Sequence, residues 1–194
     1  AYSLMSVAAD FGITQVVDGT LGVHARIVPH YLNAYATAEQ KLRWLPKLAS
    51  GEWIGAIAMT EPGVGSDLQS ITTTAVKDGN GYRISGSKTY ISSGQIADFI
   101  IVVAKTDPNE RAKGISLMLL ETEGTEGFQR GRKLDKMGQH FADTAELNFE
   151  NVRVPNANLL GKEGHGFYHL MTNLPSERLS IAIAAVAGAR ATFN

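Results

Sequence analysis

The sequence predicts an α+β protein in which an antiparallel β-barrel or β-sandwich is flanked by helical segments. Three regions with different hydrophobic patterns along the 194 residues support this prediction. Residues 1–52 have helical spacing, residues 53–160 have the short apolar or alternating runs of strands, and residues 161–194 return to helical spacing. We therefore expect the end of a helical domain, a complete middle β domain and the first helix of a helical-bundle domain, divided at these bounds.

The clearest helix of the first region begins at a capping box. Thr37 and Gln40 have the spacing at which a threonine hydroxyl and a glutamine side chain each satisfy a free backbone N–H. Gly51 marks the expected end of this helix, and Pro29 is expected in or near a kink. The apolar residues at helical intervals between these ends are Leu42, Trp44, Leu45 and Leu48.

The middle region contains a series of predicted strands joined by turns rich in glycine and aspartate. The turn Asp78–Gly81 is a strong hairpin signal because its residues tolerate positive φ angles. Short strands without long helices between them favour an antiparallel barrel or sandwich. The predicted strands are Trp53–Met59, Thr72–Lys77, Tyr82–Ser85, Lys88–Ser92, Phe99–Lys105, Ile115–Glu121 and Thr144–Phe149.

The last region predicts a helix that begins at Pro175, a residue suited to the first helical position. Glu177 would then lie in the first turn. The helix is apolar nearly all round, so we expect it to be buried among other helices. Because the chain opens on Ala1 and closes on Asn194 within helical patterns, we expect a segment of a longer protein that lacks both termini.

Composition and charge exclude several classes of function. With 18 basic and 19 acidic residues, the net charge of −1 argues against nucleic-acid and membrane-surface binding. The absence of cysteine excludes disulfides and thiol nucleophiles. No apolar run approaches the ~18 residues of a membrane span, no signal peptide is found, and the scattered histidines predict no metal site. The only dense basic cluster is expected to be a solvated loop: Arg130, Arg132, Lys133 and Lys136.

The segment Thr60–Asp67 is the first candidate for chemistry. Its glycines permit a ligand to approach backbone N–H groups closely, and Thr60 and Ser66 add hydroxyls. It is neither a Walker loop nor a dinucleotide fingerprint, because the residues and glycine spacing differ from both. A tight Pro-Gly turn without a ligand explains the spacing equally well.

Three stretches together resemble the acyl-CoA dehydrogenase family: Thr60–Asp67, Ser85–Gly94 and Lys133–Gly138. Phe149–Pro155 and Leu160-Gly161 also match, so the resemblance covers essentially the whole chain, and the motifs occur in the family's order. Family members have an N-terminal helical domain, a middle β-barrel and a C-terminal four-helix bundle, and they bind FAD. The resemblance therefore implies an FAD cofactor.

The resemblance also implies flavin-binding positions. One segment would contact the edge of the isoalloxazine ring, and a second would pack on the ring and bring a hydroxyl toward N5. Family members often have Trp at the position of Tyr90 and Thr at that of Ser92, so the aromatic plane and the hydroxyl are kept. For Tyr90 the alternative is a core-filling strand residue. The implied positions are Met59, Thr60, Gly65 and Ser66, then Tyr90, Ile91 and Ser92.

Glu177 is the candidate catalytic base. Removal of a proton from the carbon α to a thioester needs a base of suitable pKa in a dry site. In long-chain and isovaleryl-type members, the base precedes an arginine on this helix, as Glu177 precedes Arg178. The resemblance further implies that Arg178, Tyr168 and Ser66 contact the substrate. The alternative for Glu177 is a purely structural acid that favours a helix N-terminus.

The implied activity is FAD-dependent α,β-dehydrogenation of long- or branched-chain acyl-CoA to trans-2-enoyl-CoA, a step of fatty acid β-oxidation. The implied partners are acyl-CoA, electron-transferring flavoprotein and further copies of the chain in a homotetramer or homodimer. The expected location is a bacterial cytoplasm or a mitochondrial matrix. Two alternatives remain open: a flavin-dependent oxidase or monooxygenase on the same scaffold, and a non-catalytic β-barrel binding module.

Overall fold

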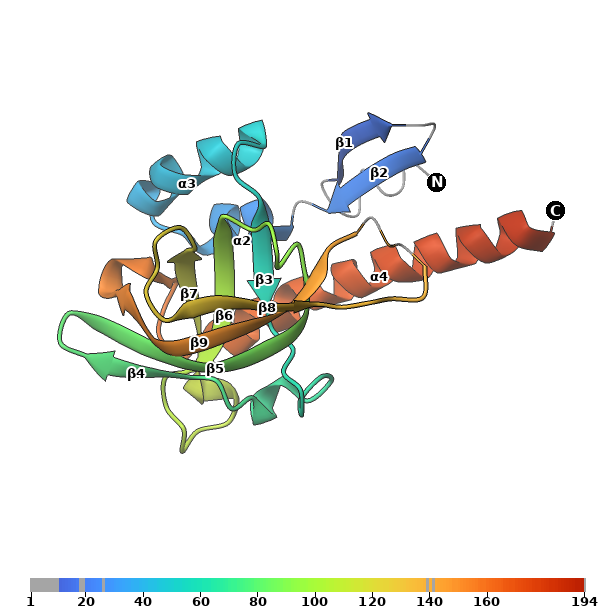
Figure 1. Cartoon of the computed structure of the whole chain (residues 1–194). Coiled ribbons are helices and arrows are strands. Elements are labelled where there is room, and N and C mark those ends of the chain that lie inside the picture. The colour runs from blue at the N-terminus through green and yellow to red at the C-terminus, as the bar shows by residue number, and fades with distance from the viewer. Residues whose placement is uncertain (1–10, 18–19, 26, 139, 141, 194) are drawn as a thin grey trace.

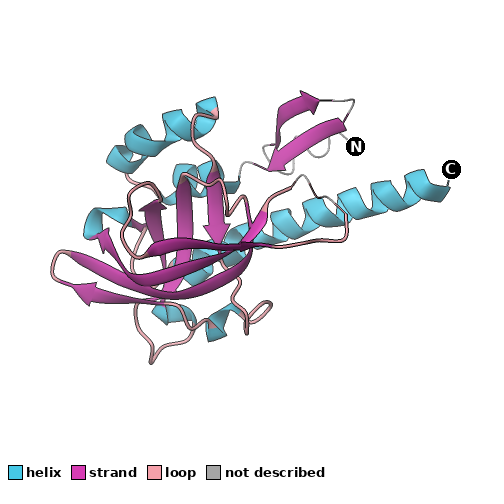
Figure 2. Ribbon diagram, viewed as in Figure 1, coloured by secondary structure: helices cyan, strands magenta, loops and turns pink. Residues whose placement is uncertain are grey.

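A computed structural model describes residues 11–17, 20–25, 27–138, 140 and 142–193 (Figures 1 and 2). The helices are α2 (Ile27–Tyr35), α3 (Ala38–Ser50) and α4 (Gly166–Phe193). The strands are β1 (Phe11–Val17), β2 (Thr20–Ala25), β3 (Gly55–Ala58), β4 (Thr74–Asp78), β5 (Gly81–Ser92), β6 (Phe99–Lys105), β7 (Ile115–Glu121), β8 (Phe128–Lys133), β9 (Thr144–Pro155) and β10 (Leu159–Leu160).

An eight-stranded sheet forms the body of the molecule, in the order β10-β7-β6-β4-β5-β9-β8 with β3 beside β6. The α+β class, with a largely antiparallel sheet flanked by helices, is confirmed. In the described residues the sheet is open rather than closed into a barrel. It is also mixed, because β3 runs parallel to β6 and Thr74 of β4 pairs in parallel with Lys105 of β6. Hairpin signals report only neighbours along the chain, so they gave no sign of the parallel partner of β3.

The central strands β6 and β7 are buried on both faces. Alternate side chains point to opposite sides of a strand, so each strand contributes to two cores. The inner core, between the two halves of the bent sheet, contains Ile100, Val102 and Ala104 of β6. The helix-facing core contains Phe99, Ile101 and Val103 of the same strand and packs under α2, α3 and α4.

The ends of α3 are formed as the sequence predicts. The Thr37 hydroxyl accepts a hydrogen bond from the Gln40 N–H at 3.2 Å, and the Gln40 side chain accepts one from the Thr37 N–H at 3.0 Å. Gly51 ends the helix in the left-handed conformation at φ 79°. Trp44 and Leu48 are buried, whereas Leu42 of the same predicted apolar series is 79% exposed.

The predicted hairpin is confirmed, since Asp78 of β4 pairs with Gly81 of β5. Two strands predicted separately, Tyr82–Ser85 and Lys88–Ser92, are parts of the single long strand β5. The bounds of β6 and β7 agree with the predictions.

The first region is only partly helical, so the prediction of helix throughout residues 1–52 is wrong where β1 and β2 lie. These strands form an antiparallel hairpin, with Val17 paired to Thr20, and their β-branched residues favour strand. Residues 1–10 lie outside the described part of the chain. Pro29 is the third residue of α2 rather than the site of a kink, because a proline is tolerated in the first turn, where its N–H is not needed.

The last helix begins earlier than predicted. It starts at Gly166, and Pro175 lies inside it. Proline has no N–H to donate to the carbonyl of Met171, four residues earlier, so the first-position assignment was wrong, and Glu177 is far from the positive end of the helix. The end of α4 extends away from the sheet (Figure 1). In this chain its apolar side chains are exposed, 53% at Leu179 and 70% at Ile181. The burial that we expect against further helices of a longer protein stays a prediction.

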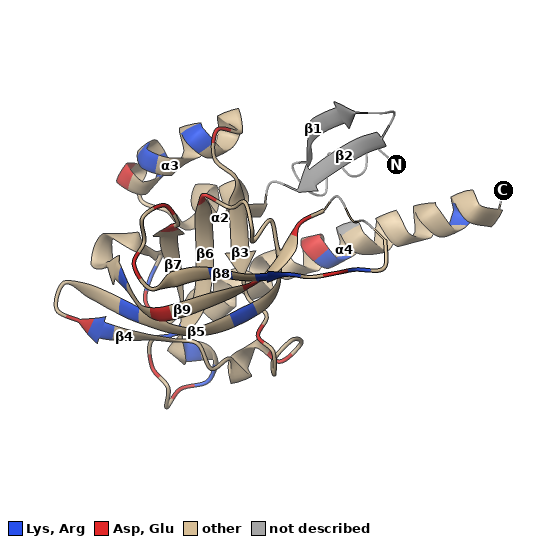
Figure 3. Cartoon of the chain, in the orientation of Figure 1, with Lys and Arg blue, Asp and Glu red and all other residues tan. Residues whose placement is uncertain are grey.

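The basic cluster is not a loop, because Arg130, Arg132 and Lys133 lie on β8 at an end of the sheet (Figure 3). Their side chains point largely to solvent. Elsewhere acidic and basic residues are interspersed along the described fold (Figure 3). Among the described helices, none is long and apolar enough to cross a membrane.

The close approach of β5 to Thr73 depends on Gly86, which has a φ of 149°. A Cβ at this position would lie 2.5 Å from the Thr73 hydroxyl oxygen and 2.7 Å from its Cα. We predict that Gly86→Ala destabilises the fold by about 2 kcal/mol, measured by urea denaturation. The control is Gly63→Ala, where a Cβ meets nothing within 4 Å. An equal effect of the two substitutions would contradict the prediction.

Candidate functional site

The glycine loop, Thr60–Asp67, leaves the end of β3 as a tight turn. Glu61 and Val64 exchange two backbone hydrogen bonds, of 2.9 and 3.0 Å. Gly65 and Ser66 are exposed at the tip, and a Cβ at Gly65 would meet nothing within 4 Å. The tip therefore offers open backbone and a hydroxyl to a ligand.

The second predicted segment lies directly beside this loop, because the Thr89 N–H donates to the Thr60 carbonyl at 2.9 Å. The register of β5 against β9 shifts between Lys88 and Ile91, and Tyr90 at this bulge has a φ of 58°. Such a conformation costs a tyrosine about 1–3 kcal/mol. Tyr90 is 68% exposed, so it does not fill the core.

Of the two residues that follow, Ile91 is buried in the inner core and Ser92 is exposed. The structure therefore brings the two predicted flavin segments together and leaves the Tyr90 ring and the Ser92 side chain accessible. Whether these positions hold a flavin stays a prediction.

Sequence reasoning missed a buried ion pair beneath the loop. Lys88 Nζ lies 3.0 Å from Glu61 Oε1, and the two side chains are 0% and 2% exposed. Lys88 also donates to the Met59 carbonyl at 3.0 Å. Glu61 accepts from the Thr72 N–H and hydroxyl, both at 2.7 Å, and from the Thr73 N–H at 2.9 Å.

Both members of this pair have altered pKa values. Burial alone would raise the pKa of Glu61, but the Lys88 ammonium and the threonine hydrogen bonds lower it to about 2. Burial lowers the pKa of Lys88 to about 8, against the opposing effect of Glu61. The pair is therefore ionised at neutral pH.

On the helical side, α2 and α4 meet along a polar seam made by His30, Tyr31, Tyr35, His169, Asn173 and Glu177. His30 Nε2 lies 3.0 Å from Asn173 Oδ1. Asn173 Nδ2 donates to the Tyr35 hydroxyl at 3.3 Å, and the rings of Tyr35 and His169 stack at 3.8 Å. Because residues four apart share one face of a helix, Glu177 lies on the same face of α4 as Asn173.

Glu177 is half-buried at the end of this seam. The Tyr31 hydroxyl, which belongs to a fully buried side chain, donates to Glu177 Oε1 at 3.4 Å. Burial raises the pKa of Glu177, while the hydrogen bond from Tyr31 and the nearby His30 lower it. The balance is a carboxyl group whose pKa lies above its ordinary value.

The glycine loop and the Glu177 helix share the helix-facing core. Met59 and Val64 from the loop side, and Met171 and Leu174 from α4, pack against the buried residues of this core, which include Tyr31. Leu174 precedes Glu177 by about one helical turn. A common apolar layer therefore positions both halves of the candidate site.

The two predicted substrate residues on α4 are less closely associated with Glu177. Arg178 is exposed. Tyr168 is 46% exposed and precedes Glu177 by about 2.5 turns, which places it on the opposite face of a regular helix. The described contacts therefore do not gather Tyr168 and Glu177 into one cluster.

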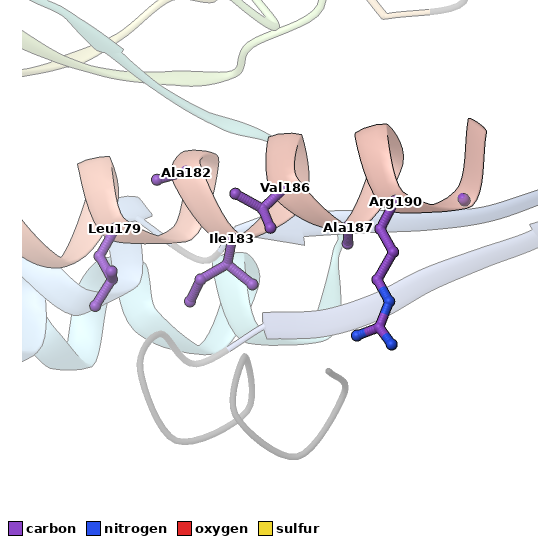
Figure 4. Close-up of a pocket in the computed structure, with 7 residues that line it drawn as sticks. Leu179, Ala182, Ile183, Val186, Ala187 and Arg190 are labelled. Atoms are coloured by element: carbon purple, nitrogen blue, oxygen red, sulfur yellow. The ribbon is translucent and has the colours of Figure 1, made fainter. Parts of the chain in front are cut away.

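A hollow of about 650 Å³ lies along the exposed end of α4 (Figure 4). Its described lining belongs to this single helix and contains one charged residue, Arg190. It lacks the converging polar groups of a specific ligand site, so the candidate site is the region around the glycine loop and Glu177. The lining residues are Leu179, Ala182, Ile183, Val186, Ala187, Arg190 and Ala191.

The described structure therefore combines a β-sheet that presents an exposed glycine loop with a helix that presents a half-buried acid. Residues 56–152 match the family model of the acyl-CoA dehydrogenase middle domain, and residues 5–52 match that of the N-terminal domain. The chain belongs to the acyl-CoA dehydrogenase family.

Curated relatives include two mitochondrial enzymes. The long-chain specific acyl-CoA dehydrogenase of Sus scrofa is 50% identical over 195 residues, covering 100% of this chain and 45% of its own length. The isovaleryl-CoA dehydrogenase of Oryza sativa subsp. japonica is 43% identical over 165 residues, covering 85% of this chain and 40% of its own. The chain thus spans less than half the length of these relatives.

A similar solved structure is the acyl-CoA dehydrogenase of Geobacillus kaustophilus. It is 57% identical with a TM-score of 0.80, and the match covers 84% of this chain and 43% of that one.

The Glu61–Lys88 pair predicts an acid-sensitive fold. Because the folded pKa of Glu61 lies below its ordinary value of 4.5, its contribution to stability is complete above pH 4.5 and is lost as the pH falls toward 2. From this group we expect the free energy of unfolding to fall by about 2 kcal/mol between pH 6 and pH 3, measured by urea denaturation at the two pH values. The double variant Glu61→Gln/Lys88→Met should lack this component, and an unchanged slope in that variant would refute the assignment.

Proposed function

We propose that the protein is an FAD-dependent acyl-CoA dehydrogenase that converts acyl-CoA thioesters to trans-2-enoyl-CoA. The observation that carries the proposal is the half-buried carboxylate of Glu177, hydrogen-bonded by Tyr31, on the same core as the glycine loop. Burial raises the pKa of Glu177 above its ordinary value, the direction that makes a carboxylate a stronger general base.

The residues around the glycine loop fit a flavin. An exposed tyrosine ring at a strained bulge suits a planar cofactor, and the open tip at Gly65 and Ser66 permits close approach. The Met59 and Thr60 carbonyls already accept hydrogen bonds from β5. We therefore assign hydroxyl groups to the cofactor instead, those of Thr60, Ser66 and Ser92. FAD, when bound, accepts the hydride that leaves the β-carbon of the substrate.

Glu177 would take the α-proton of the thioester. The C–H electron pair then forms the new double bond as the β-hydride departs, so the product carries two hydrogens fewer than the substrate. The Tyr31 hydroxyl orients the carboxylate from α2, and the apolar layer below it buries part of the carboxyl group. Both effects favour proton transfer by a positioned base.

The substrate is proposed to be a long- or branched-chain acyl-CoA. The long-chain and isovaleryl-specific relatives support this preference. Ser66, Arg178 and Tyr168 are proposed to contact the thioester and acyl portions. The exposed positions of all three leave them accessible to a ligand.

The remaining proposals concern the setting of the enzyme. We assign residues 1–52 to the end of an N-terminal domain, which holds the β1–β2 hairpin as well as α2 and α3, residues 53–160 to the β domain and residues 161–194 to the start of a helical domain. We further propose a homotetramer or homodimer, with electron-transferring flavoprotein as the electron acceptor. Mitochondrial relatives and a bacterial relative support a mitochondrial matrix or a bacterial cytoplasm as the location.

The direct test is Glu177→Gln in the full-length protein. We expect the rate of flavin reduction by acyl-CoA to fall by about 10²–10⁴-fold, the usual contribution of a general base, while the affinity for FAD is unchanged. Anaerobic stopped-flow absorbance measures the rate. The matched control is Glu123→Gln, an exposed acid of the turn after β7, which should reduce FAD at the wild-type rate.

A wild-type rate in Glu177→Gln would place the base elsewhere. Peroxide formation from the wild-type protein without a protein electron acceptor would favour the flavin oxidase alternative. A colourless protein that does not take up FAD would favour a non-catalytic binding module.

Tyr31→Phe tests how the base is tuned. Because the hydrogen bond from Tyr31 lowers the raised pKa of Glu177, its removal should move the acid limb of the rate–pH profile to higher pH. His30 is the other titratable group that acts on Glu177, and it is unaffected by this change. Flavin reduction measured between pH 5 and pH 9 gives the profile. Tyr82→Phe on β5 is the control, and a shift equal to that of the control would exclude this role of Tyr31.

A further inference from the structure

The Glu61–Lys88 ion pair is the most completely buried charged group in the described part of the chain. The Glu61 and Lys88 side chains are 2% and 0% exposed. In each of the other described ion pairs, both side chains are more than 30% exposed. Lys88 lies at the start of the β5 bulge, and Glu61 is the second residue of the glycine loop. The pair therefore connects the two segments assigned above to the cofactor.

Stability alone is a weak reason for such a pair. The desolvation of two charges offsets much of their attraction, and apolar residues of similar volume often replace a buried pair without loss of stability. Buried polar groups can instead select one geometry among several. The contacts of this pair indicate which geometry it selects.

The Lys88 side chain binds the backbone at the start of the loop. Its ammonium bridges Glu61 Oε1 and the Met59 carbonyl, both at 3.0 Å. The neighbouring Thr89 N–H holds the Thr60 carbonyl at 2.9 Å. The consecutive carbonyls of Met59, just before the loop, and Thr60, its first residue, are thereby both bonded to β5.

Glu61 fixes the loop from the other side. Its two oxygens accept from the Thr72 N–H, the Thr72 hydroxyl and the Thr73 N–H, at 2.7 to 2.9 Å. The loop is thus attached to the segment that enters β4 as well as to β5. Beyond the bulge, the buried Ile91 anchors the other side of Tyr90, which is itself exposed.

We propose that Glu61 and Lys88 are positioning residues that lock the glycine loop onto the β5 bulge and so present Thr60, Ser66 and Tyr90 to FAD in a fixed arrangement. This inference rests on the proposed function for the identity of the ligand. The locking of the loop itself can be measured without any ligand.

The test compares wild type with Glu61→Gln/Lys88→Met in the full-length protein, a double change that leaves no buried charge unpaired. In the flavin-free protein, we expect amide hydrogen exchange in residues 60–66 and 89–92 to be at least tenfold faster in the double variant. Exchange in β6 and β7 should be unchanged. With FAD added, the dissociation constant should rise at least tenfold.

The control for stability is Trp44→Phe on helix α3. This change removes the indole N–H that donates to Glu121 of β7 at 2.7 Å. It should lower the melting temperature and leave both the local exchange and the FAD affinity unchanged. Glu61→Gln and Lys88→Met, made singly, should each affect the loop more than the double variant does, because each leaves one buried charge without its partner.

Wild-type exchange in both segments of a folded double variant would overturn the proposal. So would a weakened FAD affinity in Trp44→Phe equal to that of the double variant, because general destabilisation would then explain both. If the wild-type protein binds no FAD, the proposed function fails, and the exchange comparison alone decides whether the pair locks the loop.

Discussion

The burial of β6 and β7 on both faces is the constraint on which the candidate site depends. One face of these strands closes the inner core, and the other supports α2, α3 and α4. The loop after β3 and the first half of α4 rest on the same helix-facing layer. Segments separated by more than 100 residues in the sequence, such as Val64 and Leu174, are thereby held in one region.

Two carboxylates in this region differ in a way that bears on function. Glu61 accepts hydrogen bonds from four donor groups and is almost fully buried. Within the described part of the chain, Glu177 accepts one hydrogen bond, at 3.4 Å, and is partly accessible. A saturated carboxylate is suited to hold backbone in place, whereas one with free lone pairs and a raised pKa is suited to accept a proton. This contrast supports separate structural and catalytic roles for the two acids.

Local signals predicted the elements whose ends are determined locally. The capping box at Thr37, the stop at Gly51 and the bounds of β6 and β7 are examples. Pro175 was misleading because a proline inside a helix leaves the same local pattern as one at its start. The parallel pairing of β3 with β6 is long-range and has no local signature.

For the site, the family motifs placed the glycine loop and the Tyr90 segment, but contacts between distant residues were not predictable. Lys88 carried one usable signal, because it follows Tyr82 and Ile84 at an even number of residues. Side chains at even spacing share one face of a strand, here the buried face of β5. A lysine buried there needs a partner of opposite charge. Nothing in the sequence near Glu177 indicated Tyr31, because the contact joins two helices 146 residues apart.

The central claim is that a carboxylate on α4 and a flavin at the glycine loop act on one acyl-CoA. Anaerobic titration of the purified full-length protein with acyl-CoAs of graded chain length, followed by flavin absorbance, tests it most directly. The account predicts a yellow protein whose absorbance is bleached stoichiometrically, most readily by a long- or branched-chain substrate. A protein that binds FAD and stays fully oxidised with every acyl-CoA would contradict it.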